Sequence, residues 1–259
     1  MFKLYYRLTK PGIIYGNTLT ALAGFFLASK GHVDLGLLFA TIIGVSLGIA
    51  SACVFNNYVD RGIDGKMERT KNRALVTGAV SSKAALIFAT ILGLAGVTIL
   101  FIFTNITTIF LGAVGFFFYE VLYGITKRRS VWSTVMGAVS GAMPPVAGYT
   151  AVTGRIDLGA ILLFLILFFF PLPPFSSLSL SLLHSYPSSI LPIIPSFVLI
   201  FSPKFHILLY TILVTIFSSL LSVTGYAGRV NLVVMLTVSI MWCAYALIGF
   251  STKNTPLWY

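Results

Sequence analysis

Four polar side chains recur at every fourth position at the end of a long apolar run, namely Asn56, Asp60, Asp64 and Glu68. Residues four apart on an α-helix differ in direction by only about 40°, so all four are predicted to project from one face of a helix. The chain has only six acidic residues, and three of them stand in this row. Because carboxylates within an apolar segment mark ion or substrate sites, the row predicts a cation site at a helix end.

The basic residues that follow indicate what the cation would bind. Mg²⁺ usually binds through one or two carboxylates together with substrate phosphates, and Asp60, Asp64 and the amide oxygen of Asn56 can supply the protein's share. Side chains able to grip diphosphate oxygens follow in two groups, Arg69, Lys71 and Arg73, and then Lys127, Arg128 and Arg129. The pattern predicts a magnesium diphosphate site. The alternative is a set of ordinary juxtamembrane charges that pair at helical spacing.

The composition requires a membrane to position these residues. Hydrophobic residues make up 58% of the chain, charged residues only 9%, and the mean hydropathy is +0.98, whereas soluble domains carry about 25% charged residues. Apolar stretches predict eight membrane-spanning helices, at about 13–27, 35–59, 84–103, 107–125, 135–152, 158–170, 207–223 and 230–250. We therefore expect an all-α, polytopic transmembrane helical bundle that forms a single domain over residues 1–259. Pro144 and Pro145 are expected to break the fifth span near its middle, where a freed carbonyl could shape a cavity, and the alternative is a structural kink.

The distribution of Lys and Arg predicts the orientation, because these residues are retained on the cytoplasmic side. With the N-terminus inside, all of the 17 basic residues except Lys30, Arg155 and Arg229 fall on that side. The predicted site then opens to the cytoplasm, and the net charge of +11 is a topology signal. No nucleic-acid partner is expected, because the basic residues are divided among membrane-proximal loops.

Several motifs resemble one family. Asn56, Asp60 and Asp64 match the first Asp-rich motif of the UbiA-type intramembrane prenyltransferases, and RTKNRAL at 69–75 matches the segment that follows it there. Within that superfamily the chain looks like the haem O synthases, or protohaem IX farnesyltransferases. The supporting stretches are TKPGIIYGN at 9–17, CVFNNYVDRGIDGKMERTKNRAL at 53–75, YGITKRRSVWST at 123–134 and SGAMPPVAGY at 140–149.

The resemblance implies a nine-helix pattern and the transfer of a farnesyl group from farnesyl diphosphate to a vinyl group of haem b, with addition of water, to give haem O and diphosphate. It implies Mg²⁺ as cofactor, held by Asn56, Asp60 and Asp64, which are also the catalytic residues. It further implies a bacterial inner membrane location and a partner enzyme or oxidase that receives the haem product.

The allylic cation formed in such a reaction needs a dry cavity with aromatic faces. The aromatic side chains available for this lining include Tyr15, Phe55, Tyr58, Tyr119 and Tyr149. For any one of them, packing or interfacial anchoring is the alternative.

One stretch departs from the family pattern. Members carry a second acidic motif after the sixth span, whereas no residue after Asp157 is acidic here. Residues 171–203 combine the Pro and Ser content of a linker with the Leu, Ile and Phe content of a span. We expect that this segment is read out of frame and that the chain ends before the family's ninth span. Because leaving-group stabilisation is the main catalytic term, we expect very low activity from this chain.

Two other functions are kept as alternatives. One is a UbiA-type enzyme that prenylates an aromatic acid or quinone precursor. The other is a secondary transporter with Asp60 and Asp64 as a cation-coupling site, for which internal repeats and acids near mid-bilayer are expected.

Overall fold

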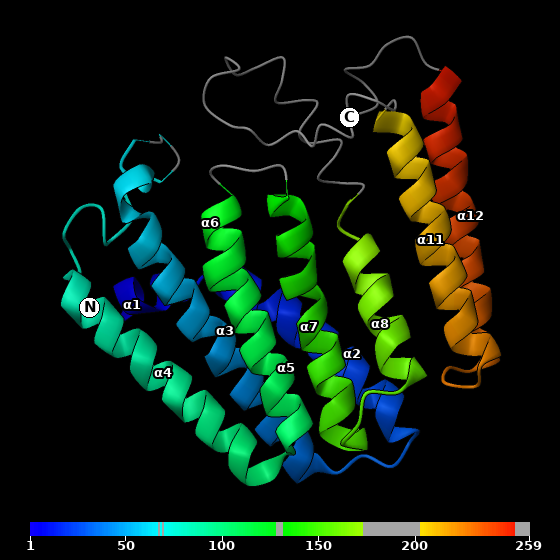
Figure 1. The fold of residues 1–259 in the computed structure, drawn as a ribbon, viewed down its shortest axis with the longest axis horizontal. Coiled ribbons are helices and arrows are strands. Elements are labelled where there is room, and N and C mark those ends of the chain that lie inside the picture. Colours follow the sequence, from blue (N-terminus) through cyan, green and yellow to red (C-terminus); the bar gives the residue numbers. More distant parts are fainter. Residues whose placement is uncertain (67, 69, 128–131, 173–202, 252–259) are drawn as a thin grey trace. The chain divides into compact units, whose positions relative to one another are not determined.

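The computed structural model describes residues 1–66, 68, 70–127, 132–172 and 203–251, and these form helices and turns without a strand. The helices are α1 (Phe2–Leu8), α2 (Pro11–Ser29), α3 (Leu35–Asp64), α4 (Ser82–Phe103), α5 (Ile106–Phe117), the π-helical segment η1 (Phe118–Tyr123), α6 (Gly124–Thr126), α7 (Ser133–Thr153), α8 (Leu158–Phe169), α11 (Pro203–Val223) and α12 (Arg229–Ser251) (Figure 1). The chain divides into two compact units, one of Met1–Gly124 with Met143–Arg155 and one of Ile125–Ala142 with Ile156–Tyr259.

Each of the eight predicted spans corresponds to a helix, which confirms the all-α membrane fold. Within the described part of the chain, α2, α3, α4 and the continuous stretch Ile106–Thr126 are long and apolar enough to cross a bilayer. Shorter apolar helices cover Leu158–Phe169, Leu208–Val223 and Arg229–Ala244. Helix α1 was not among the predicted elements.

Short polar side chains mark the starts of several helices. The side chains of Asp34, Ser81, Asn105 and Asp157 each accept a hydrogen bond from the backbone N–H three residues later, at the first turns of α3, α4, α5 and α8. Such caps satisfy donors that the helix itself leaves open. Polar residues between apolar runs therefore determine where these spans begin.

In the first unit α3 packs along α4, and small residues bring the two backbones close together. A side chain at Gly96 would lie 2.9 Å from the carbonyl oxygen of Gly44, and the Ser51 hydroxyl donates to the Ala89 carbonyl at 2.8 Å. Buried alanines, Ala85 and Ala89, face α3 in the same core. This close contact fixes the helix that carries the predicted site.

The prediction that Pro144 and Pro145 break their span is wrong, because α7 continues from Ser133 to Thr153 with both prolines inside it. The buried Pro145 packs against α2, where Gly24 leaves room for its carbonyl oxygen. Packing against a neighbouring helix can hold proline-containing turns in helical form within a membrane protein.

In the second unit α8, α11 and α12 pack through aromatic side chains. Phe169 at the end of α8 stacks on Tyr210 and Phe217 of α11, with ring centroids 6.0 and 5.8 Å apart. Phe170 meets Trp242 of α12 edge to face. The segment 171–203, which we expect to be out of frame, lies outside the described residues except for Pro171, Leu172 and Pro203.

Candidate functional site

The predicted polar row is only partly one helical stripe. Asn56, Asp60 and Asp64 lie on the last turns of α3, which ends at Asp64 with Gly65 as its C-terminal cap. Glu68 follows the helix end, so the prediction that it continues the stripe is wrong. Its carboxylate is exposed and pairs with Lys71 at 2.6 Å. The site therefore rests on the three residues that the helix carries.

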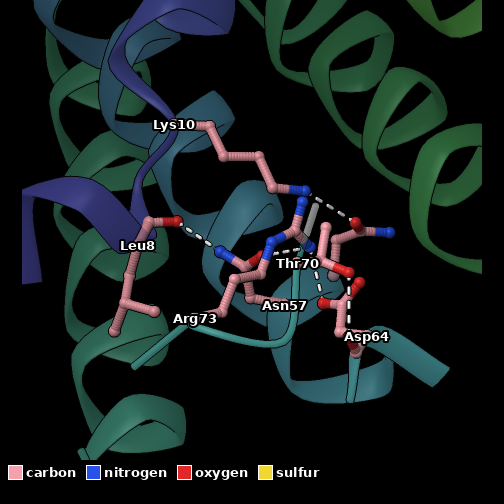
Figure 2. A network of polar contacts seen from close by, with 7 residues as sticks. Leu8, Lys10, Asn57, Asp64, Thr70 and Arg73 are labelled. Carbon is pink, nitrogen blue, oxygen red and sulfur yellow. Dashed lines mark hydrogen bonds and ion pairs between the residues drawn. The ribbon is translucent and has the colours of Figure 1, made fainter. Parts of the chain in front are cut away.

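The loop after α3 turns back onto the helix end (Figure 2). Arg73 reaches the Asp64 Oδ2 atom with its Nη1 atom at 2.6 Å and also donates to the Asn57 Oδ1 atom at 3.2 Å. The Thr70 hydroxyl donates to the Asp64 carbonyl at 2.9 Å. Asp64 is 6% exposed and Asn57 4%, so this carboxylate and amide are buried, whereas the Arg73 side chain that contacts them is half-buried.

The junction between α1 and α2 completes the network from the other side. The Asn57 amide donates to the Leu8 carbonyl at 2.7 Å, and the Lys10 Nζ atom donates to the Asn56 Oδ1 atom at 2.8 Å. Lys10 has left-handed backbone angles, φ 52° and ψ 68°, directly before Pro11. The right-handed helical region is disfavoured before proline, and the left-handed region is unusual for a lysine. The chain holds this conformation where it delivers the ammonium group to α3.

An apolar layer supports these polar contacts. Leu8 of α1, Val54 of α3, and Leu75 and Val80 of the loop are all buried in one cluster with α4 alanines. Tyr5 packs edge to face on Phe88 of α4, with ring centroids 5.1 Å apart. The loop that carries Arg73 is therefore anchored by its own apolar side chains as well as by the ion pair.

The π-helical segment η1 also packs against α3. Phe55 of α3 meets Phe116 edge to face just before η1 begins, and Tyr119 stacks on Tyr123 within it. π-helical turns within α-helices occur frequently at functional sites.

Glu120 was not among the predicted site residues, although it is a carboxylate within the apolar stretch Ile106–Thr126. It lies in η1, and its Oε1 atom is buried. A carboxylate inside a predicted span was the sequence signal that could have identified it.

The other predicted lining residues are dispersed. Tyr149 of α7 is buried, Tyr58 is half-buried with the Arg61 guanidinium 4.0 Å above its ring, and Tyr15 is 65% exposed on α2. Tyr15 and Tyr6 share a hydrogen bond of 2.7 Å, which raises the pKa of the Tyr6 hydroxyl above its ordinary value. Of the lining candidates among the tyrosines, Tyr119 lies in η1, which packs against α3.

The predicted diphosphate-binding cations have different positions. Arg73 is part of the network, and Lys71 is in the loop next to it, paired with Glu68. Lys127 belongs to the second unit. Arg69, Arg128 and Arg129 lie outside the described residues.

The donor atoms can be tested against the predicted metal. Among the described residues, no group of three or more His, Cys, Asp or Glu side chains is arranged to hold a metal ion without other ligands. Two carboxylates and an amide oxygen, from Asp60, Asp64 and Asn56, are a suitable share for Mg²⁺ when a bound diphosphate supplies further oxygens. The residues fit a metal diphosphate better than a bare metal ion.

Comparison with known proteins places this arrangement in context. The sequence pattern of the UbiA prenyltransferase family matches residues 17–258. The protoheme IX farnesyltransferase of Photorhabdus laumondii subsp. laumondii is 44% identical over 259 residues, which are 100% of this chain and 88% of that protein.

Solved structures show the same fold. A digeranylgeranylglyceryl phosphate synthase superposes with a TM-score of 0.80 over 99% of this chain and 90% of that one, at 16% identity. A UbiA homologue from Archaeoglobus fulgidus, bound to GPP and Mg²⁺, superposes with a TM-score of 0.64 over 95% of this chain and 85% of that one, at 17% identity.

Proposed function

This chain belongs to the UbiA prenyltransferase family, and from that premise we propose that it transfers the farnesyl group of farnesyl diphosphate to a vinyl group of haem b. The products are haem O and diphosphate. The observation that carries the proposal is the buried network at the end of α3, where Arg73 and Lys10 meet the side chains of Asp64, Asn57 and Asn56. Carboxylates and cations gathered at one end of a membrane helix suit a lipid with a diphosphate head.

The residues divide the work by their chemistry. Asn56, Asp60 and Asp64 would hold Mg²⁺, which when bound neutralises charge on the diphosphate. Arg73 would bind the departing diphosphate through its guanidinium, and Lys71 and Arg69, which follow α3 in the sequence, would assist it. Negative charge on the leaving group grows in the transition state, so these cations bind the transition state more tightly than the substrate.

The transfer breaks the bond between farnesyl carbon 1 and a diphosphate oxygen. A new carbon–carbon bond forms to the vinyl group, water adds its oxygen to the resulting cation, and one proton is released. Aromatic side chains where η1 packs against α3, including Tyr119 of η1 and Phe55 of α3, would shield the farnesyl cation from early attack by water.

The orientation proposed for the site is cytoplasmic, and the membrane is a bacterial inner membrane. Lys and Arg flank the spans on the side where α3 ends, which supports this orientation. The haem product would pass to a later enzyme or to an oxidase.

The relatives favour haem over a quinone precursor as the acceptor, because the Photorhabdus laumondii protein matched over the full chain is a protoheme IX farnesyltransferase. A transporter role has less support. In the structure Asp64 closes the last turn of α3 beside a basic loop, and is not near the middle of the span.

Pigment analysis after expression in cells that make no haem O of their own tests the proposed reaction. We expect haem O in a small amount, because the second acidic motif of the family is absent from this chain. Replacing residues 171–203 with the corresponding stretch of the Photorhabdus laumondii relative should raise the rate about 100-fold or more, since leaving-group stabilisation is worth several orders of magnitude.

Two results would contradict these expectations. A prenylated quinone precursor, with no haem O from either the native chain or the chimera, would refute the proposed acceptor. Equal rates of haem O formation from the two chains would refute the claim that the missing motif limits activity.

A further inference from the structure

Lys10 occupies an unusual position for a residue that the sequence motifs do not assign to the site. Its backbone is in the left-handed region between α1 and α2, and its side chain spans to α3, where Nζ lies 2.8 Å from the Asn56 Oδ1 atom. Left-handed backbone at a non-glycine residue costs free energy and persists where surrounding contacts impose it. The hydrogen bond from the Asn57 amide to the carbonyl of Leu8, two residues before Lys10, is such a contact.

The atom that Lys10 contacts is one that we assign to the metal. Arg73 likewise contacts an oxygen of a proposed metal ligand, because its Nη1 atom lies 2.6 Å from the Asp64 Oδ2 atom. Two of the three proposed metal ligands are thus each held by a cation of the protein itself. An ammonium group at hydrogen-bond distance opposes a divalent cation at the same oxygen, because like charges repel strongly at short range in a partly buried site.

We propose that Lys10 is a diphosphate-binding residue of this site. Its ammonium group donates to the Asn56 side chain until a metal diphosphate binds, and it then donates to the diphosphate oxygens instead. The proposal rests on the proposed function, because it takes Asn56 as a ligand of Mg²⁺. The backbone of Lys10 is fixed, whereas its four-carbon side chain is flexible and its ammonium group is a point charge suited to phosphate. Binding of metal and diphosphate would then be coupled. A metal ion without diphosphate would bind more weakly, because the Lys10 ammonium group would still lie at Asn56.

A purely structural role makes a different prediction. If Lys10 only docked the α1–α2 junction onto α3, its loss would loosen the site and weaken the binding of every ligand. If Lys10 exchanges partners, its loss frees Asn56 for the metal and removes a contact from the diphosphate. The two roles therefore predict opposite effects of removing Lys10 on the affinity for a metal ion without diphosphate.

The experiment measures two affinities on the purified full chain in detergent, for Mn²⁺ alone by electron paramagnetic resonance and for inorganic diphosphate with Mg²⁺ by calorimetry. Lys10→Met should bind Mn²⁺ several-fold more tightly and magnesium diphosphate about tenfold more weakly, the size expected for one charge-assisted hydrogen bond. Lys10→Arg should retain diphosphate binding. The matched control is Lys3→Met, which removes the same charge from an exposed position on α1 and should change neither affinity.

Weaker binding of both ligands by Lys10→Met, or no change in either, would overturn the role of Lys10 while leaving the proposed function standing. A wild-type chain that does not bind magnesium diphosphate at all would instead overturn the proposed function, and the role of Lys10 with it.

Discussion

The end of α3 and the loop that follows it carry two ion pairs with the same distance between charged atoms, and the two pairs differ in their exposure to solvent. Arg73 lies 2.6 Å from Asp64, with side chains 29% and 8% exposed, and Lys71 lies 2.6 Å from Glu68, with side chains 47% and 89% exposed. Exposed ion pairs contribute about 0–1 kcal/mol, because water and salt screen them. A buried carboxylate that loses its partner costs considerably more, because it has also lost its water.

Arg73→Met should therefore destabilise the protein more than Lys71→Met. We expect a loss of about 2 kcal/mol for Arg73→Met, which leaves Asp64 and Asn57 without this donor, and less than about 0.5 kcal/mol for Lys71→Met. Thermal unfolding in detergent followed by circular dichroism measures the difference. Equal melting temperatures for the two variants would show that the Arg73 pair does not anchor the loop.

At the scale of elements, close approach between helices depends on glycine at two positions of the α2–α7 contact. A Cβ atom at Gly24 would lie 1.9 Å from the Pro145 carbonyl oxygen, and one at Gly148 would lie 2.0 Å from the Ala21 carbonyl oxygen. Both neighbours are backbone atoms, which cannot move without moving their helix. These glycines explain how α7 packs directly on α2 along the turns that contain its two prolines.

Gly24→Ala should destabilise the first unit by about 1–3 kcal/mol, the usual cost of overpacking. Gly16→Ala is the matched control on the same helix, because no atom lies within 4 Å of the added Cβ there. That change should be neutral or stabilising by up to about 1 kcal/mol, since alanine favours helix more than glycine does. Gly24→Ala should lower the melting temperature, whereas Gly16→Ala should leave it unchanged or raise it. A Gly24→Ala variant as stable as the parent would contradict the close packing.

The sequence predicted the spans better than it predicted the ends and contacts of the helices. Hydropathy marks a span because the bilayer requires about 20 apolar residues, and each of the eight predicted spans corresponds to a helix in the described part of the chain. It does not show where a helix stops, and the row was extended to Glu68 although α3 ends at Asp64. Helical spacing also gave no sign of the π-helical turn at η1, which carries Tyr119 and Glu120.

The sequence predicted the candidate residues on α3, and it did not predict the contacts that the α1–α2 junction makes with them. Asn56, Asp60 and Asp64 follow from their spacing on one helix, and Arg73 follows from its place in the basic segment. Lys10 is 46 positions from Asn56, and Leu8 is 49 positions from Asn57, so these contacts depend on tertiary packing that no local pattern reveals.

At the scale of the whole molecule, the described site is one half of the arrangement that the family resemblance implies. All acidic residues of the chain lie at or before Asp157, so the second acidic motif has no counterpart in the sequence. In the half that is present, hydrogen bonds join Lys10 to Asn56, and Arg73 to Asp64 and Asn57. The missing second motif should therefore lower the reaction rate more than it lowers the affinity for a diphosphate, because catalysis requires stabilisation specific to the transition state.

The central claim, a magnesium-dependent diphosphate site at the end of α3, is tested most directly by the binding of farnesyl diphosphate to Asp60→Asn and Asp64→Asn variants, with and without Mg²⁺. The control is Asp34→Asn, which makes the same change at the other end of α3, where asparagine can also cap the helix. We predict that Mg²⁺ strengthens binding to the parent chain and to the control, and that each of the two site variants loses about tenfold or more of that gain. Unchanged magnesium-dependent binding in both site variants would contradict the account.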